Sequence, residues 1–507
     1  MPISASDLTT VRGISTVERS FQATAQNLPP KIALLGYYDN TIATVVDDTP
    51  VLLLNANDAG TRFGFGTHLH RLAKYAFSGR GSSSVPIYAV PVADPVGATA
   101  SERTITVTGP ATAAGSIVVK AGSFLADDAL TVSIANGDDA TAIGAAIAAA
   151  ITANSSLPFS ATAALGVVTL VCKTKGAVGE GYAVTVDTTN APAGTTFVVA
   201  SSVTATGTHV ITDALAGITA SNIWFTDIVA PEYTSVFLAA ADTFVGNPNN
   251  KTGKYDSISY TPCVFWFANT AGGSAGLSSA ITVGDNNKGI AGALYVQAPS
   301  YKEQTGEICA YLAGTVRVVS ASNPAKDFTG LSLGLLGGPV VLTDDWTTDY
   351  ASRNLAIQNG LAFIKREGST PVVGDLTTLW HPADNQNGGF KWLVNQCKIW
   401  NIANSIKLDD ARPENFNRPI VSDAARSRIA DAIDTDMVRA RIATLAGQWA
   451  SRGWIYTDGY TIENMIVSIN DANPDRIDKT VPVILSGNNR IEDTEVQVDR
   501  NLAIVEV

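Results

Sequence analysis

The end of the chain is the feature that most restricts what it can fold into. Residues 494–507 place apolar side chains at a period of two residues, which is the pattern of a β-strand. From Leu502 onward both faces are apolar, because Leu502 and Ile504 lie on one face while Val505 and Val507 lie on the other. A strand of this kind aggregates unless another strand pairs with it. We therefore expect residues 489–507 to be an arm that adds a strand to a neighbouring copy, with pairing inside its own domain as the alternative.

The beginning of the chain has a similar character. Residues 1–30 are polar and carry no apolar core of a secretory signal. Their short extended pieces include Ile14, Thr16 and Val17, which we expect to take part in strand addition between subunits. The sequence thus predicts a second extended arm at the N-terminus.

Composition and charge narrow the class of protein. With 507 residues, 46% of them hydrophobic, the chain can form several domains with sizeable cores, and no apolar run is long enough to cross a membrane. The net charge of −12 argues against direct nucleic-acid binding through a basic surface. We therefore expect a chain that neither inserts into a membrane nor contacts nucleic acid directly.

Four widely spaced cysteines, Cys172, Cys263, Cys309 and Cys397, form no metal-binding pair. We interpret them as small buried apolar residues of a protein made in a reducing cytoplasm. A disulfide between subunits after release into an oxidising medium is the alternative.

The middle of the chain predicts an α/β domain interrupted by an insertion. Apolar strands at 31–36, 85–92, 222–229, 263–268 and 293–297 alternate with helices such as 232–244, which is typical of a parallel sheet covered on both faces. The middle domain is expected to comprise 31–100 and 208–354. Residues 101–207 are rich in Ala, Thr, Gly and Val and predict a β-rich outer module with one helix, 139–153.

Residues 355–488 predict a C-terminal α+β domain, so the fold class is α/β in a multidomain (α+β) chain. A hairpin at 361–373 and a helix at 389–406 precede a long amphipathic helix from Asp423 to Arg452, and a strand at 463–469 follows. Within the middle domain, residues 78–84 are expected to form a loop. The apolar stripe of the long helix is formed by Ile429, Ile433, Met437, Ile442, Leu445 and Trp449.

A search for catalytic groups gives one weak candidate. Gly272–Gly276 fits the G-x-S-x-G pattern of a hydrolase, with Ser274 as the nucleophile. Residues 269–272 separate that serine from the preceding strand, and His381 is the only histidine after it. We expect no enzyme and no catalytic residue, while a serine hydrolase or a surface-binding β module remain the alternatives of a different class.

Other motifs predict neither a cofactor nor a metal. His68 and His70 read as a solvated pair near a helix, and neither a phosphate-binding loop nor a complete dinucleotide motif occurs. The acidic pairs 47–48, 127–128 and 344–345 lie where carboxylates cap turns or face solvent.

Four arginines on the long helix alternate with acidic residues. Arg426, Arg428, Arg439 and Arg441 are interleaved with Asp431, Asp434 and Asp436. They form either a solvated, self-paired face or a charged docking surface for a partner.

Taken in order, several segments resemble the contractile phage tail sheath proteins of the Mu-like group. The similar segments are Leu28–Tyr37, the module Thr104–Val199, Asn323–Gly338, Arg353–Phe363, Asn464–Ser468, Asp475–Val481 and the tail, whereas the composition of 379–420 departs from the pattern.

The resemblance implies a structural virion protein that polymerises helically around a tail tube and contracts to drive the tube through a bacterial envelope. It implies assembly in the host cytoplasm, partners in the tube, baseplate and tail terminator proteins, and hinges near 26–30 and 486–489. Arms of neighbouring subunits would add strands at Met465, Val467 and Ile469, and the C-terminal domain would face the tube, with the four arginines as candidate tube contacts. A sheath of a phage-derived bacteriocin is the close alternative.

Overall fold

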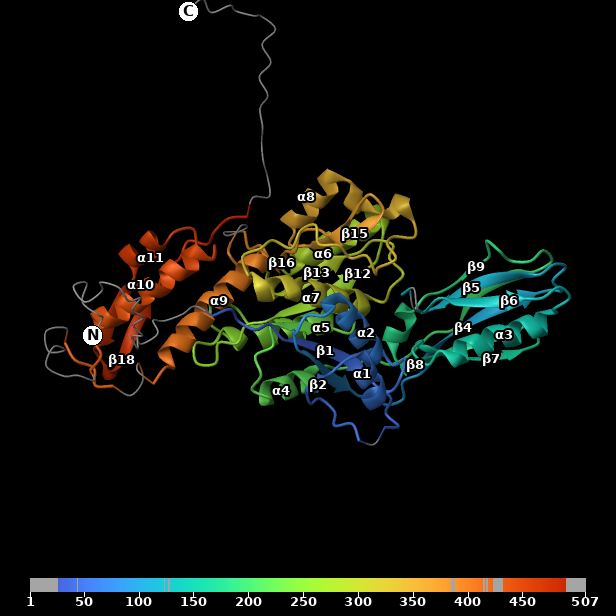
Figure 1. The fold of residues 1–507 in the computed structure, drawn as a ribbon, viewed down its shortest axis with the longest axis horizontal. Helices are drawn as coiled ribbons and strands as arrows, with labels where there is room; N and C mark the ends of the chain where they lie inside the picture. Colours follow the sequence, from blue (N-terminus) through green and yellow to red (C-terminus); the bar gives the residue numbers. More distant parts are fainter. Residues whose placement is uncertain are drawn as a thin grey trace, which may run out of the picture. The chain divides into compact units, whose positions relative to one another are not determined.

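The computed structural model describes residues 26–42, 44–122, 124–125, 128–383, 388–413, 415, 418–422 and 432–488. The chain divides into two compact units (Figure 1). One comprises residues 27–400 and is called the core unit below. The other comprises residues 401–507 together with 1–26, and its described part is called the C-terminal unit.

A nine-stranded sheet forms the centre of the core unit. Its strand order is β15-β14-β13-β12-β11-β1-β3-β2, with β16 paired to β13. The run from β14 to β3 is parallel, and β2, β15 and β16 are antiparallel to their neighbours. The strands are β1 (Ile32–Tyr37), β2 (Val51–Leu53), β3 (Ile87–Val92), β11 (Asp227–Val229), β12 (Val264–Asn269), β13 (Gly289–Gln297), β14 (Ala362–Glu367), β15 (Thr370–Val373) and β16 (Thr378–Trp380).

Helices cover both faces of this sheet, which explains why its strands are apolar on both sides. The first face packs on α2 (His68–Arg80), α7 (Thr305–Ser322) and the start of α9 (Leu393–Asp410). The opposite face packs on α4 (Thr212–Ala220), α5 (Ser235–Val245), α6 (Gly273–Asn286) and α8 (Tyr350–Gln358). The remaining short helices are α1 (Ala56–Phe63), η4 (Gly253–Tyr255), η5 (Leu342–Asp344) and η6 (Trp346–Thr348).

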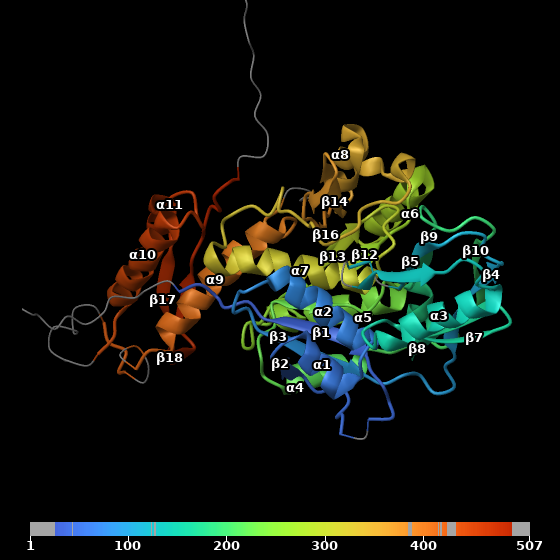
Figure 2. The same cartoon turned by 45° about the vertical axis from the view of Figure 1, so that its right-hand side comes forward.

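Helices α2 and α7 lie side by side (Figure 2). Their crossing depends on two glycines. A Cβ at Gly79 would lie 2.3 Å from the carbonyl oxygen of Tyr311, and one at Gly314 would lie 2.5 Å from that of Ala76. The backbones therefore approach more closely than any side chain would permit.

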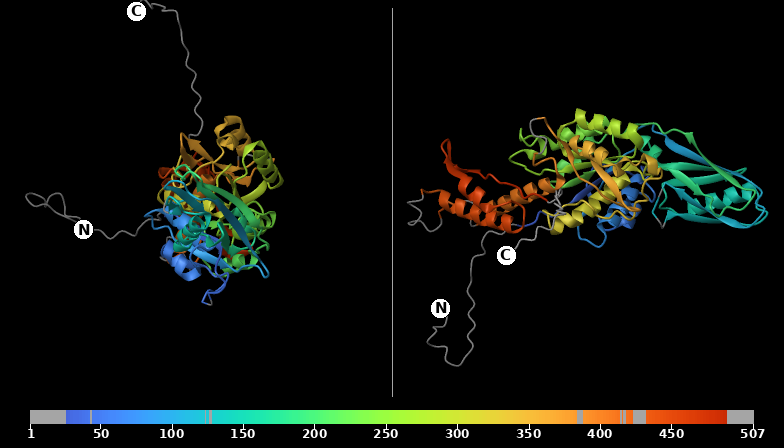
Figure 3. Two further views of the ribbon diagram at one scale, coloured as in Figure 1. Left: turned by 90° about the vertical axis from the view of Figure 1, so that its right-hand side faces the viewer. Right: turned by 90° about the horizontal axis from the view of Figure 1, so that it is seen from above.

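The insertion after β3 folds as a module with its own core, seen in teal at one end of the core unit in Figure 3. One sheet has the order β10-β4-β8-β7 and the other the order β6-β5-β9, and α3 completes the core. The elements are β4 (Ala100–Thr108), β5 (Gly115–Ala121), β6 (Leu130–Ile134), α3 (Ala140–Ala153), β7 (Phe159–Ala164), β8 (Val167–Lys175), η3 (Ala177–Gly181), β9 (Val184–Asp187) and β10 (Thr196–Val203).

The two ends of this module meet. Thr99 donates its backbone N–H to the carbonyl oxygen of Thr206 at 3.0 Å, and the two threonine hydroxyls lie 2.8 Å apart. The module thus begins and ends at one point of the α/β part of the core unit.

The C-terminal unit contains the last turns of α9 together with α10 (Thr435–Ser451), α11 (Asp458–Asn464), β17 (Ile466–Asn470) and β18 (Asn473–Thr480). A small apolar cluster joins the helices to the hairpin and is formed by Ile433, Val438, Ile442 and Val467. The indole N–H of Trp449 donates to the hydroxyl of Ser405 at 2.9 Å, which fixes α10 against α9.

The predicted mixed α/β, multidomain fold is confirmed, and several boundaries differ. Strands β14–β16, which we expected in the C-terminal domain, pair within the sheet of the core unit, and the second compact unit begins at residue 401. The loop expected at 78–84 starts later, because α2 continues to Arg80.

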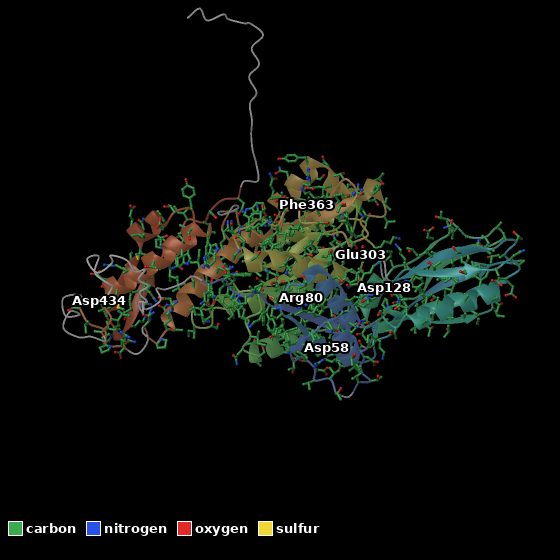
Figure 4. The ribbon with its side chains drawn as sticks, in the orientation of Figure 1. Asp58, Arg80, Asp128, Glu303, Phe363 and Asp434 are labelled. Atoms are coloured by element: carbon green, nitrogen blue, oxygen red, sulfur yellow. The ribbon has the colours of Figure 1, made fainter. Side chains whose placement is uncertain are left out.

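We predicted one continuous helix from Asp423 to Arg452, and this prediction is wrong at residues 432–434, which are not helical. The described part of α10 begins at Thr435, because the carboxylate of Asp434 (labelled in Figure 4) accepts the Met437 N–H at 2.6 Å and caps it. Residues 423–431, which include Ile429, lie outside the described residues. The strand expected from 463 begins at Ile466, because residues 458–464 form α11.

Candidate strand-addition site

The hairpin β17–β18 is a two-stranded sheet within the C-terminal unit. Val467 pairs with Lys479, Ile469 pairs with Ile477, and the side chain of Val467 is buried against α10. Two strands alone form a marginal sheet, and both outer edges of such a hairpin can accept a further strand.

One contact ties α10 to the backbone of β17. The guanidinium of Arg439 on α10 donates to the carbonyl oxygen of Val467 at 3.3 Å. Val467 pairs with Lys479 on β18, so this contact lies in the middle of the hairpin.

Ion pairs fix β18 to the two helices beneath it. Arg441 on α10 lies 2.7 Å from Asp409 and 3.2 Å from Asp410, both on α9. Lys479 on β18 forms an ion pair with Asp410. These pairs hold β18 against α9 and α10, and within the described part of the chain β17 pairs with no strand other than β18.

A groove of about 700 Å³ runs beside the same hairpin. Asp475, Ile477 and Lys479, which alternate along β18 and so share one face, form one wall. The other walls mix charged and apolar residues: Asp410, Asn415, Arg418, Pro419, Ile420, Ile433, Val438 and Arg441.

The residues predicted for strand addition are only partly described. Met465 follows α11 directly, and with Val467 and Ile469 it forms or borders β17, so these three lie together. The arm residues Ile14, Thr16, Val17, Leu502, Ile504, Val505 and Val507 lie outside the described residues.

The four arginines predicted as candidate tube contacts are also only partly described. Arg426 and Arg428 lie outside the described residues. Arg439 is half-exposed and lies 3.2 Å from Asp436, as expected of a self-paired face. Arg441, expected to face outward, instead has a mostly buried side chain that pairs with α9.

The carboxyl edge of the parallel sheet, where open α/β folds bind ligands, is filled by the stem of the module. The ring of His209, on the return segment of the module, stacks on that of Tyr37 at the end of β1, with centroids 3.3 Å apart. His68 stacks on the same tyrosine at 5.2 Å. His209 and His68 are both fully buried, so this edge is occupied by protein side chains.

The expectation of a solvated histidine pair is therefore wrong. His68 and His70 are both buried, and burial lowers the pKa of His68 to about 3 and that of His70 to about 4. His70 accepts the Gly66 N–H at 3.0 Å through its Nδ1 atom. Both rings pack as neutral core groups at the start of α2.

One residue of the acidic pairs, Asp128, has a different role from the one expected. Asp128, labelled in Figure 4, is buried and lies 3.1 Å from Arg71 and 2.7 Å from Lys74, both on α2. It therefore anchors the module to the α/β part of the core unit. Arg71 in turn lies 2.8 Å from the buried Glu307 on α7. Asp345 caps η6, as expected, and also lies 3.0 Å from Arg366.

The structure separates Ser274 and His381, the two groups that the hydrolase alternative requires. Ser274 is the second residue of α6, whereas the N–H of His381 donates to the carbonyl oxygen of Lys288, just beyond the other end of that helix. Fourteen residues at 1.5 Å each separate the two ends by about 20 Å. Ser274 and His381 therefore cannot form a nucleophile–base pair.

Three further expectations concern cysteines, metals and membranes. All four cysteines are free and buried. Among the described residues, no group of three or more metal-ligating side chains comes together, and no helix there is long and apolar enough to span a membrane.

Sequence reasoning missed β18 and the contact between Arg439 and Val467. The signal for β18 was weak, because Ile477 is its only strongly apolar residue. The pair Asp471–Ala472 between two strand-like segments is the feature that could have indicated a hairpin.

No protein-family model matches the chain, and no curated protein matches it. Solved structures do match. The sheath complex of an extracellular contractile injection system, PVC, in its contracted state aligns over 97% of this chain and 98% of that chain, with a TM-score of 0.51 and 11% identity.

Two other sheath structures align with lower scores. The sheath tail protein from Desulfitobacterium hafniense covers 93% of this chain and 100% of its own, with a TM-score of 0.47 and 12% identity. The contracted helical sheath of the anti-feeding prophage covers 97% of this chain and 100% of its own, with a TM-score of 0.42 and 10% identity. On the PVC alignment, the chain has the fold of a contractile sheath protein.

Proposed function

We propose that this chain is the structural subunit of a contractile tail sheath, which polymerises helically around a tail tube and contracts to drive the tube through a bacterial envelope. The observation that carries the proposal is the fold shared with the PVC sheath over 97% of the chain. The placement in the Mu-like group rests on the sequence resemblance alone.

Strand addition is the proposed link between subunits. The open edge of β17, with Met465, Val467 and Ile469 along it, would receive the extended arms of neighbouring copies. The apolar residues of the arms, Ile14 and Val17 at one end and Leu502, Ile504, Val505 and Val507 at the other, supply the side chains of the added strands. Because donor and acceptor differ, the contact is heterologous and propagates as a helix.

The proposed partners are further copies of the chain, a tail tube protein, and the baseplate and tail terminator proteins. Arg439, which is half-exposed on α10, is a candidate for a weak, salt-sensitive contact to the tube. Arg426 and Arg428, which lie outside the described residues, are further candidates. Arg441 is a poorer candidate, because its guanidinium already pairs with Asp409 and Asp410. The subunit would be made in the bacterial cytoplasm and act in the particle.

The proposed source of energy is strain stored during assembly, with no nucleotide and no catalytic residue. The filled carboxyl edge of the sheet supports this, because His209 and Tyr37 occupy the place where an α/β fold would hold a cofactor.

A phage-derived bacteriocin or injection-system sheath is the second candidate. The PVC sheath, which aligns with a TM-score of 0.51, is part of an extracellular contractile injection system. The subunit would work in the same way in either particle.

Deletion of residues 496–507 tests the proposal. We expect a folded, soluble monomer that forms no tubes, because each backbone hydrogen bond contributes only about 0.5–1.5 kcal/mol but the added strand is repeated in every subunit. Negative-stain microscopy of the purified protein reads out tubes, rings or striated cylinders.

The matched control is Glu506→Gln, which alters the same segment without removing an apolar residue and should leave polymerisation intact. Tubes of normal appearance from the truncated chain would overturn the strand-addition model. A full-length chain that never assembles would overturn the proposed function itself.

A further inference from the structure

Helices α4 and α5 lie on the surface of the core unit and carry almost no charge. Each contains a single charged residue, Asp213 on α4 and Asp242 on α5. The outward residues Ala216 and Ala239 are exposed, as is Val236 at the start of α5. A surface helix usually presents charged side chains to solvent, so an outward face of this composition indicates a contact surface.

A groove of about 420 Å³ lies between the two helices. Its lining from α4 includes Leu215 and Ala216, its lining from α5 includes Ala239, Ala240 and Phe244, and three threonines complete the walls. Of the described residues around it, no Asp, Glu, Lys or Arg lines the groove. The alanines leave room that longer side chains would fill, so the groove can receive an apolar side chain from another molecule.

The turn between β7 and β8 holds an apolar side chain in a strained backbone conformation. Ala164 pairs with Val167, so Leu165 and Gly166 form a two-residue turn, with φ values of 50° and 80°. A turn with positive φ at both positions prefers asparagine followed by glycine. Leu165 adopts this conformation at a cost and is 91% exposed. A leucine kept at such a position indicates that another surface covers it.

Leu165 lies at the outer end of the module. Near the inner end of β8, the hydroxyl of Thr174 accepts the backbone N–H of His68 on α2 at 3.0 Å. Strand β8 is paired on both sides, and the seven steps from Thr174 to Val167 at about 3.3 Å each span roughly 23 Å. Figure 1 shows the module extending away from α4 and α5. Leu165 therefore cannot reach the groove of its own chain.

Both surfaces suit a contact between two copies of an acidic chain. Residues 140–172, which include the turn, contain no Asp, Glu, Lys or Arg. With a net charge of −12, copies of the chain repel one another, whereas two uncharged surfaces can meet without burying ions. A projecting leucine on one copy and an alanine-lined groove on the next are also complementary in shape.

We propose that Leu165 of one subunit inserts into the α4–α5 groove of a second copy of this chain. The inference rests on the proposed function, because a side chain and a groove at different places on one chain make a head-to-tail contact that propagates through an assembly. It adds a contact between core units that is independent of strand addition by the terminal arms.

Replacement of the leucine separates folding from assembly. Leu165→Asn suits the turn, so thermal unfolding should show a protein at least as stable as the unaltered chain. The same variant should need about tenfold more protein to form tubes, because each added subunit loses the burial of one leucine. Sedimentation of assembled protein over a concentration series measures the change. Unchanged assembly would overturn the proposal.

Filling the groove tests the other half of the contact. Ala239→Leu places a longer side chain where Leu165 would insert, and it should raise the required concentration by a similar factor. Ala220→Leu, at the exposed last residue of α4 and outside the groove, is the matched control and should assemble normally. Equal assembly of the two variants would contradict the assignment of the groove.

Cysteine pairs in the full-length chain report the contact directly. We expect Leu165→Cys combined with Ala216→Cys or with Ala239→Cys to give a ladder of covalent dimers, trimers and larger species on mild oxidation of tubes. Each single cysteine variant should remain monomeric on a denaturing gel. The four natural cysteines are buried, so the unaltered chain provides the background.

Other results of the oxidation experiment overturn the proposal. Dimers from Leu165→Cys alone would indicate a symmetric contact between two turns. Normal tubes with no ladder from either double variant would refute the contact with the groove while leaving the sheath function intact. Absence of tubes from the unaltered chain would remove the proposed function and this inference with it.

Discussion

The guanidinium of Arg439 donates to the carbonyl oxygen of Val467 at 3.3 Å, so one side chain of α10 contacts the backbone of β17. Arg439, the proposed contact to the tube, therefore lies beside the residues proposed for strand addition.

Replacing this arginine should affect the tube contact and spare the lattice. We expect Arg439→Ala to fold and polymerise normally but to co-sediment with tail tubes about threefold less well at moderate salt, because an exposed pair contributes about 0–1 kcal/mol. Sedimentation with purified tubes at two salt concentrations measures the change. Arg476→Ala, an exposed arginine on β18, is the matched control, and equal binding by both variants would remove Arg439 from the tube contact.

Removal of the module should leave a protein that folds with lower stability. Because Thr99 and Thr206 are hydrogen-bonded, a short Gly/Ser linker replacing residues 101–205 closes a small gap at little entropic cost. The protein should fold but lose stability, since Arg71 and Lys74 would lose Asp128. Chemical denaturation measures the loss, and a replacement that yields no soluble protein would show that the module is part of the core.

A point variant isolates that penalty. Asp128→Asn should reduce the free energy of unfolding by about 2 kcal/mol, because Lys74 loses its carboxylate partner and Arg71 keeps only Glu307. Asp139→Asn is the control, since asparagine caps a helix as well as aspartate does and α3 should be unaffected. Equal stability of the two variants would mean that Asp128 does not anchor the module.

A second buried ion pair lies at the centre of the core unit. Arg317 on α7 lies 2.5 Å from Asp227 on β11, and Asp227 also accepts from the indole of Trp266 at 2.7 Å. Arg317→Met should destabilise the protein by about 3–5 kcal/mol, because the Asp227 carboxylate would remain buried and uncompensated.

Urea unfolding measures this effect. The exposed pair of Arg62 with Asp58 supplies the control, where Arg62→Met should change stability by less than about 1 kcal/mol. The double variant Arg317→Met with Asp227→Leu should recover part of the loss. A single variant as stable as the unaltered chain would contradict the assignment.

Glu232 should make stability depend on pH. Burial raises the pKa of Glu232 from 4.5 to about 7, so the folded state binds its proton more tightly than the unfolded state does. Ionisation then opposes folding fully above pH 7, and the penalty disappears as the pH falls through 7 toward 4.5. Glu232→Gln should therefore stabilise the protein by about 2–3 kcal/mol at pH 8–9 and have no such effect at pH 4.5.

Thermal unfolding of the two proteins across this range gives the comparison. Glu367→Gln is the control, because Glu367 is exposed on β14 and its ion pair with Lys365 should contribute less than about 1 kcal/mol at any pH. A difference between Glu232→Gln and the unaltered chain that stays constant from pH 4.5 to 9 would contradict a raised pKa.

The sequence predicted the strands of the parallel sheet well, because apolar runs such as β12 are buried on both faces and have no other interpretation. Helix α7 escaped prediction for the opposite reason. Most of its residues are buried on all sides, including the charged Glu307 and Arg317, so it lacks the polar face that would give a helical period.

The candidate site was harder to predict than the sheet. The residues predicted a strand at 463–469, and the family resemblance assigned Met465, Val467 and Ile469 of that strand to strand addition. In contrast, β18 carries charged and polar residues at nearly every position. Its pairing depends on ion pairs such as Lys479 with Asp410, which are distant in sequence. The anchoring role of Asp128 was hidden for the same reason, because a carboxylate in a turn looks solvated until its partners are known.

The burial of every thiol has a consequence for how long an assembled particle endures. Burial raises the pKa of Cys172 to about 11 and that of Cys263 to about 12, and it raises the pKa of Cys309 and Cys397 as well. A thiol reacts with oxidants as its thiolate, so these sulfur atoms stay inert while the fold persists. An assembly of this chain can therefore be exposed to air without chemical change at its cysteines for as long as its subunits stay folded.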